Sequence, residues 1–172
     1  ANFGGDKNNL IVCGESAGGN LAAAVALMAR DKKGPVLAGQ ILIYPAITSI
    51  IDDDVYKASI DQYYLTKEAM EYFWDMYLQL PEHKTDYYAS PDQASNFSSL
   101  PKALIITAEY DPLNVEGEKY AKLLSQSGVD VISKCFREVV HGFISLPIYD
   151  ENQKNIWIDE ITKLAKELGI LK

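Results

Sequence analysis

A serine enclosed by glycines follows the first apolar run of the chain and precedes an alanine-rich segment with helical spacing. This run consists of Gly14, Glu15, Ser16, Ala17, Gly18 and Gly19. A sharp strand-to-helix turn strains the serine backbone, and a glycine two residues to either side removes Cβ atoms that would collide as the helix folds back. We therefore predict a nucleophile elbow that exposes the Ser16 hydroxyl. The alternative interpretation is a glycine-rich turn that only begins a helix.

A nucleophilic serine needs a base to take its proton and an acid to orient that base. Asp111 comes four residues after the apolar run 103–107 and is followed by Pro112, which cannot continue a strand. His141 comes five residues after the apolar run 131–136. We expect both side chains at one sheet edge, in the chain order Ser, Asp, His that α/β-hydrolases use. Ser16, Asp111 and His141 are thus predicted to form a triad for acyl transfer.

Other residues compete for these roles. Glu109 is the other candidate for the acid. The alternative interpretation of Asp111 is an ordinary turn residue before a proline. His83 lies in a polar run inside a long connection, where a surface role suits it. Glu15, beside the nucleophile, is predicted to bond to nearby backbone or a neighbouring strand rather than to act in catalysis.

The elements that must position these residues alternate along the chain. Short apolar runs rich in β-branched residues predict parallel strands at 10–13, 40–44, 103–107 and 131–136. Helical spacing predicts helices at 17–30, 115–127 and about 152–168, the last ending at Gly169. Strand and helix alternate, which indicates the α/β class.

The segment from about 49 to 100 is longer than a connection between strand and helix needs, so we interpret it as an insertion. Within it, Thr66 is predicted to cap a helix beginning at Lys67. An apolar stripe on this helix contains Met70, Phe73, Trp74, Tyr77 and Leu78. We expect the stripe to face the core, and the alternative is that it lines an acyl or alcohol pocket. The same choice applies to Tyr63, Tyr64, Tyr87 and Tyr88.

The composition limits the partners. With 16 basic and 24 acidic residues among 172, the net charge is −8, which argues against nucleic acid or an anionic membrane surface as a partner. No apolar run approaches the roughly 18 residues of a spanning helix, and we expect a cytoplasmic protein. His83 and His141 are the only histidines, so we expect no metal and no cofactor. Cys13 and Cys135 are predicted to be small buried hydrophobes without a disulfide.

The motifs together resemble the hormone-sensitive-lipase family of α/β-hydrolases, which includes the bacterial family IV carboxylesterases. They are FGGD at 3–6, GESAGGN at 14–20, SP at 90–91, LP at 100–101, DPL at 111–113, EGE at 116–118 and HGF at 141–143. The resemblance implies Ser16 as nucleophile, Asp111 as acid and His141 as base, acting on small esters. It also implies that the backbone N–H of Ala17 serves the oxyanion hole. Glu15 stands where the family more often has aspartate.

Family members also carry an HGGG motif before the elbow, and this sequence contains none. The elbow strand is the fifth of that fold, so we expect residues 1–172 to form the C-terminal part of an α/β-hydrolase domain. The expected architecture is four mainly parallel strands with flanking helices and a helical insertion. Fewer oxyanion donors predict weak ester hydrolysis by these residues alone. The uncovered edge of the strand at 10–13 predicts association into a homo-oligomer.

Two alternative functions remain open at this point. One is a non-catalytic small-molecule-binding module, as in the gibberellin receptors that resemble the family. The other is a serine peptidase of related fold.

Overall fold

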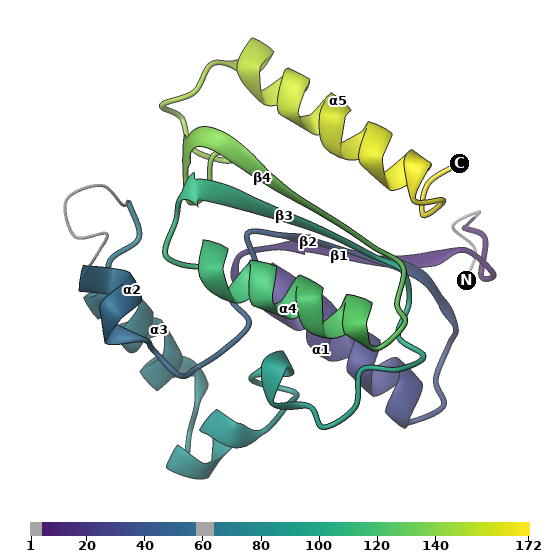
Figure 1. Ribbon diagram of the computed structural model, residues 1–172, viewed down its shortest axis with the longest axis horizontal. Coiled ribbons are helices and arrows are strands. Elements are labelled where there is room, and N and C mark those ends of the chain that lie inside the picture. Colours follow the sequence, from purple (N-terminus) through teal and green to yellow (C-terminus); the bar gives the residue numbers. More distant parts are fainter. Residues whose placement is uncertain (1–4, 58–63) are drawn as a thin grey trace.

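The computed structural model describes residues 5–57 and 64–172. Tyr63 and the motif residues Phe3 and Gly4 lie outside these ranges. The described strands form a sheet in the order β1-β2-β3-β4, in which every neighbouring pair is parallel (Figure 1). They are β1 (Leu10–Glu15), β2 (Leu37–Ile43), β3 (Ala103–Tyr110) and β4 (Val131–Val140). The predicted α/β class and parallel sheet are confirmed.

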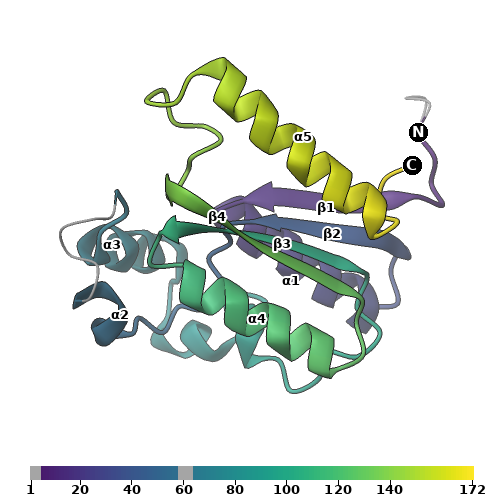
Figure 2. The ribbon, with the colours of Figure 1, turned by 45° about the horizontal axis from the view of Figure 1, so that its top comes forward.

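Helices cover both faces of this sheet. Two of them, α1 (Ala17–Asp31) and α4 (Asn114–Gln126), lie on one face, and α5 (Glu151–Glu167) crosses the other (Figure 2). The core under α1 and α4 includes Ala22, Ala23, Ala26, Leu27, Leu42, Ile105, Tyr120 and Leu124. The core under α5 includes Ile41, Leu104, Ile106, Phe136, Phe143, Ile161 and Ala165. Within the described ranges, no helix is both long and apolar enough to span a membrane.

The strands that lead to the acid and the base are longer than predicted. β3 and β4 continue to Tyr110 and Val140, beyond the expected ends at 107 and 136. Their pairing contains a register shift between Ala108 and Tyr110, and Glu138 adopts a positive φ of 59° in the partner strand. This irregularity lets pairing resume at Tyr110 and Val140, so the next residue of each strand leaves the sheet at the same edge.

The segment between β2 and β3 contains short helices. They are α2 (Asp53–Lys57), α3 (Lys67–Tyr77) and the 3₁₀ turns η1 (Pro81–Thr85) and η2 (Pro91–Gln93). Thr66 caps α3 as predicted, because its Oγ1 accepts the backbone N–H of Ala69 at 3.2 Å. A small core holds α3 against the segments that follow β2 and β3, through Ala46, Leu65, Met70, Trp74 and Leu113.

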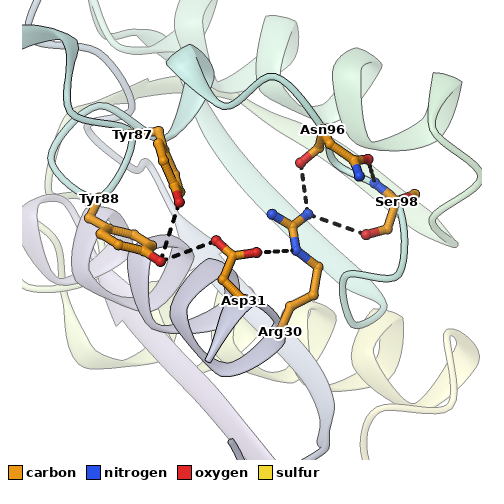
Figure 3. A network of polar contacts seen from close by, with 6 residues as sticks. All are labelled: Arg30, Asp31, Tyr87, Tyr88, Asn96 and Ser98. Carbon is orange, nitrogen blue, oxygen red and sulfur yellow. Dashed lines mark hydrogen bonds and ion pairs between the residues drawn. The ribbon is translucent and has the colours of Figure 1, made fainter. Parts of the chain in front are cut away.

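Arg30 ties the last part of this segment to the end of α1. Its Nη1 donates to the backbone oxygens of Asn96 at 2.7 Å and Ser98 at 3.2 Å, while its Nε donates to Asp31 Oδ1 at 2.7 Å (Figure 3). One guanidinium therefore satisfies two backbone carbonyls and a carboxylate, which fixes the chain just before it enters β3.

The tyrosines of the segment divide between two environments. Tyr88 donates its hydroxyl to Asp31 Oδ2 at 3.2 Å, and Tyr87 donates to the Tyr88 hydroxyl at 3.4 Å (Figure 3). Both rings pack against the core under α1, which agrees with a structural role. Tyr64, by contrast, is exposed.

β1 is an edge strand in the described sheet, and this changes the environment of the first cysteine. Each of its residues is exposed or half-buried, Cys13 is exposed, and the prediction of a buried thiol was wrong. Cys135 is half-buried on β4. Both thiols are free, because β2 and β3 separate the two strands, as the prediction of no disulfide required.

Candidate active site

Ser16 occupies a strained turn between β1 and α1. Its backbone adopts φ 53° and ψ −118°, a left-handed φ that costs a residue with a side chain about 1–3 kcal/mol. Backbone hydrogen bonds join the turn to β2 and the chain after it, since the Ser16 N–H donates to Ile43 O at 2.9 Å and Ser16 O accepts the N–H of Ala46 at 3.2 Å. The predicted elbow geometry is therefore present.

The glycines of the elbow do not all serve the predicted purpose. A Cβ at Gly14 would lie 2.1 Å from Gly18 O, and one at Gly19 would lie 2.7 Å from the Cβ of Pro45. A Cβ at Gly18 would meet no described atom within 4 Å. The close approach that excludes side chains thus falls at Gly14 and Gly19, and the prediction for Gly18 was wrong.

Asn20 is a structural part of the elbow that the sequence reasoning did not single out. Its buried side chain donates from Nδ2 to the backbone oxygens of Ala46 and Ala89, both at 2.8 Å. These bonds join the first turn of α1 to the chain after β2 and to the segment before β3. The only early signal was its place in the GESAGGN motif.

The structure brings the three predicted triad residues together. His141 Nε2 lies 2.9 Å from Ser16 Oγ, and His141 Nδ1 lies 2.7 Å from Asp111 Oδ2. Asp111 and His141 are both buried, at 2% and 7% exposure. This chain of contacts has the order nucleophile, base, orienting acid that acyl transfer by serine requires.

The competing residues lie elsewhere. Glu109 lies at the protein surface, where its carboxylate accepts hydrogen bonds from Arg137 Nη1 at 2.8 Å and from the N–H of Glu138 at 2.9 Å. These two donors lower the pKa of Glu109 and leave it as a surface ion-pair partner. His83 lies in η1, and its described backbone contacts are with Leu80 and Asp86, within the segment between β2 and β3.

An apolar cavity of about 410 Å³ opens beside Ser16. Its walls are Ala17, Asn20 and Leu21 of α1, Ala46 after β2, and Met70, Phe73, Trp74 and Tyr77 of α3. Met70 and Trp74 are buried, whereas Phe73 and Tyr77 are 55% and 51% exposed. The expected core-facing stripe is thus only partly present. All four side chains line the cavity, as the alternative interpretation of the stripe proposed.

Ala17 is the first residue of α1, directly after the nucleophile, and it also lines this cavity. The N–H groups of the first turn of a helix have no intrahelical acceptor and lie at the positive end of the helix dipole. An oxygen that gains negative charge beside Ser16 therefore meets a favourable field here.

Glu116 is a second residue whose role the sequence reasoning missed. Its Oε1 accepts the backbone N–H groups of Ile47 at 2.6 Å and Thr48 at 3.3 Å, so α4 holds the chain that continues from the elbow contact at Ala46. Burial raises the pKa of Glu116 to about 8, and the carboxylate of Asp111 acts in the same direction. Among the residues described by the structure, no cluster of three His, Cys, Asp or Glu could hold a metal ion.

Comparison with known proteins identifies the family. Residues 1–145 match the family described as alpha/beta hydrolase fold. Carboxylesterase NlhH of Mycobacterium tuberculosis is 34% identical over 151 residues, which cover 86% of this chain and 47% of the relative. An arylesterase of Saccharolobus solfataricus is 36% identical over 146 residues, covering 84% of this chain and 47% of the relative.

A solved esterase from Pyrobaculum calidifontis has the same architecture, with a TM-score of 0.87 and 38% identity over 98% of this chain and 55% of that structure. The chain thus spans about half the length of the relatives it matches. The resemblance drawn from the motifs is confirmed. Fold and sequence relatives agree, and the chain belongs to the α/β-hydrolase fold family, in the hormone-sensitive-lipase branch that contains carboxylesterases.

Proposed function

We propose that the protein hydrolyses small, apolar carboxylic esters through a covalent acyl-enzyme intermediate, with Ser16 as nucleophile. The observation that carries the proposal is the contact chain from Asp111 through His141 to Ser16, at 2.7 and 2.9 Å, which ends at the apolar cavity. The esterase names of the relatives support the same reaction class.

The chemistry follows from the positions of the side chains. Ser16 Oγ attacks the ester carbonyl carbon while His141 Nε2 takes its proton, and Asp111 stabilises the imidazolium that forms. The tetrahedral oxyanion receives the Ala17 N–H. Collapse expels the alcohol, which takes its proton from His141, and leaves an acyl group on Ser16. Water, deprotonated by His141, then attacks the acyl carbon. The bond from this carbon to Ser16 Oγ breaks, His141 returns the proton to Oγ, and the carboxylic acid leaves.

The cavity wall indicates the substrate class. Apart from Ser16, the polar groups of the wall are the amide of Asn20, already bonded to Ala46 O and Ala89 O, and the indole N–H and phenol hydroxyl of the aromatic residues Trp74 and Tyr77. Recognition must therefore come mainly from contact with the apolar side chains of α3 and α1. A volume of about 410 Å³ suits short acyl or aryl groups better than a long chain or a folded peptide.

The nucleophile is tested directly with a fluorophosphonate probe, which phosphonylates an activated serine. We expect labelling of the protein at Ser16, no labelling of Ser16→Ala, and unchanged labelling of Ser125→Ala, which removes an exposed hydroxyl of α4. Wild-type labelling equal to that of Ser16→Ala would exclude the acyl-enzyme mechanism and favour a binding module. A parallel comparison of p-nitrophenyl butyrate with a peptide p-nitroanilide separates an esterase from a peptidase.

The sequence contains no HGGG run, so the Ala17 N–H is the oxyanion donor that the motifs provide. Removing one such donor slows acyl transfer about 10²–10³-fold in typical enzymes. We therefore expect the 172-residue chain to react with the fluorophosphonate but to turn over p-nitrophenyl esters slowly.

A further inference from the structure

The carboxylate of Glu15 connects three strand ends around the base. Tyr44, the residue after β2, donates its hydroxyl to Glu15 Oε2. Ser145, in the turn after β4, lies with its Oγ 2.9 Å from both carboxylate oxygens and donates to them. Glu15 itself ends β1, beside Ser16. The carboxylate therefore gathers two hydroxyls from residues that are 29 and 130 positions away in the chain.

The first of these partners contacts the base. The rings of Tyr44 and His141 make an edge-type contact, with centroids 4.9 Å apart and an interplanar angle of 63°. Tyr44 is 1% exposed and adopts a positive φ of 34°, a conformation that a tyrosine keeps only when its surroundings hold it there. Burial and the neighbouring Glu15 carboxylate raise the pKa of Tyr44 well above its ordinary value, so its hydroxyl remains a donor.

The second partner fixes the turn that carries the base. The N–H groups of Ser145 and Leu146 both donate to Gly142 O, at 2.8 and 2.9 Å, which closes a tight turn directly after His141. Gly142 adopts φ 80° in this turn. Because Glu15 bonds to Ser145, the turn is anchored to the elbow strand as well as to its own backbone.

We propose that Glu15 is a positioning residue that holds the His141 imidazole in line between Asp111 and Ser16, through Tyr44 on one side and Ser145 on the other. This inference rests on the proposed function of His141 as the base. Glu15 itself has no described contact with the Ser16 hydroxyl or the His141 ring, so it acts through its two partners. A carboxylate suits the position because it only accepts hydrogen bonds, and the hydroxyls of both partners donate them.

The test compares Glu15→Gln, Glu15→Asp and the control Glu82→Gln, which changes an exposed glutamate of η1. The second-order rate of fluorophosphonate reaction is measured across pH, with the folded fraction followed by circular dichroism. We expect Glu15→Gln to lower the plateau rate about 10–100-fold, because small misplacements of a catalytic group have effects of this size. Glu15→Asp is expected to retain more activity than Glu15→Gln, although glutamine matches glutamate better in size. A role in packing alone predicts the reverse order.

Tyr44→Phe gives an independent measure, since it keeps the ring beside His141 and removes only the hydroxyl. We expect Tyr44→Phe to lower the fluorophosphonate rate less than Glu15→Gln does. The double variant of Glu15→Gln with Tyr44→Phe should react no more slowly than Glu15→Gln alone, because both changes break the same hydrogen bond. A Glu15→Gln rate within twofold of wild type, or a loss that equals the loss of folded protein, would overturn the proposal.

A second readout does not depend on ester chemistry. The proton shared by His141 Nδ1 and Asp111 gives a downfield NMR resonance, which Asp111→Asn identifies by removing it. We expect Glu15→Gln to broaden this resonance through faster exchange with water, and Glu82→Gln to leave it unchanged. An identical resonance in Glu15→Gln contradicts the positioning role, whereas a wild type that fails to react with fluorophosphonate contradicts the proposed function instead.

Discussion

The carboxylate of Asp111 is held from both sides: Oδ2 lies 2.7 Å from His141 Nδ1, and Oδ1 accepts the N–H of Leu113 at 2.9 Å. An acceptor-only group at Nδ1 places the imidazole proton there and leaves Nε2 free to accept the proton of Ser16. The contact with Leu113 keeps the carboxylate from rotating, so the acid fixes both the orientation and the tautomer of the base.

Replacing Asp111 with asparagine tests this relationship. We expect Asp111→Asn to keep the fold, because an oxygen can still accept the Leu113 N–H, and to present its amide N–H₂ to His141. The imidazole then carries its proton on the wrong nitrogen, and the fluorophosphonate rate should fall about 10³–10⁴-fold. A loss below tenfold, in a variant that circular dichroism shows to be folded, would contradict the assignment of Asp111.

The proposed base also predicts a pH profile. A protonated imidazole cannot take the Ser16 proton, so the rate of labelling should fall tenfold per pH unit at the acid end of the profile. The measurement is the rate constant from neutral pH down to the pH at which the protein unfolds, with folding checked at each pH. A rate that stays constant over the whole range in which the protein is folded is incompatible with His141 as general base.

The exposed and buried residues of α3 are expected to respond differently. Phe73 is 55% exposed and lines the cavity, so Phe73→Ala should raise KM for p-nitrophenyl butyrate several-fold with little change in stability. Trp74 is 6% exposed, and Trp74→Ala should lower the free energy of unfolding by about 3–5 kcal/mol. Tyr72 lies on the same helix, is 61% exposed and does not line the cavity, which makes Tyr72→Ala the matched control. Equal effects of Phe73→Ala and Tyr72→Ala on KM would remove α3 from the substrate site.

The raised pKa of Glu116 predicts a pH-dependent stability. Its pKa rises from an ordinary value near 4.5 to about 8, so between these values the folded protein binds a proton that the unfolded chain has lost. Glu116 therefore lowers the free energy of unfolding progressively as pH rises from 4.5 to about 8, and has no further effect above that range. Glu116 remains partly accessible to solvent, which screens the anion, so we expect a loss of about 1–3 kcal/mol over this range.

Glu116→Gln keeps an oxygen for these N–H groups and removes the titration. Urea unfolding should show this variant gaining stability relative to wild type by that amount between about pH 5 and 9. Glu118→Gln, which changes an exposed residue of the same helix, should follow the wild-type curve. Parallel curves for wild type and Glu116→Gln would mean that Glu116 does not titrate in this range.

Within the described residues, β1 pairs with a strand on one side only, which predicts association between copies of this chain. Leu10 is 38% exposed on this strand, and an unpaired apolar edge can pair with a strand of another molecule. We expect the weight-average mass in light scattering to rise with concentration, and Leu10→Lys to reduce that rise because a charge at the edge disfavours pairing. A concentration-independent monomer would exclude this association.

The order of Ser16, Asp111 and His141 along the chain, and their places after apolar runs, were sufficient to predict the contacts that the structure shows. This succeeded because the carboxyl ends of parallel strands meet at one sheet edge, whatever their exact lengths. The lengths themselves were not predictable. The irregularity at Glu138 depends on pairing between β3 and β4, and no local pattern in the sequence marks it.

Contacts between residues far apart in the chain were also not predictable from the sequence. Helical spacing grouped Met70, Phe73, Trp74 and Tyr77 on one side of α3, but spacing alone does not reveal whether a neighbour or a cavity lies opposite. Glu15 was expected to bond to backbone or a neighbouring strand. One partner, Tyr44, does follow the neighbouring strand β2, whereas the other, Ser145, lies in the turn after β4 and was not expected. Such contacts become visible only once the strands are assembled.

The ties that Arg30 makes to Asn96 and Ser98 fix the end of the segment 49–100 to α1. The α3 side of the cavity wall belongs to this segment, whereas Ala17 and Leu21 on the other side belong to α1, which directly follows Ser16. If the proposed ester hydrolysis is correct, we expect exchange of the exposed α3 side chains to change ester preference without moving the strand ends that carry the acid and the base.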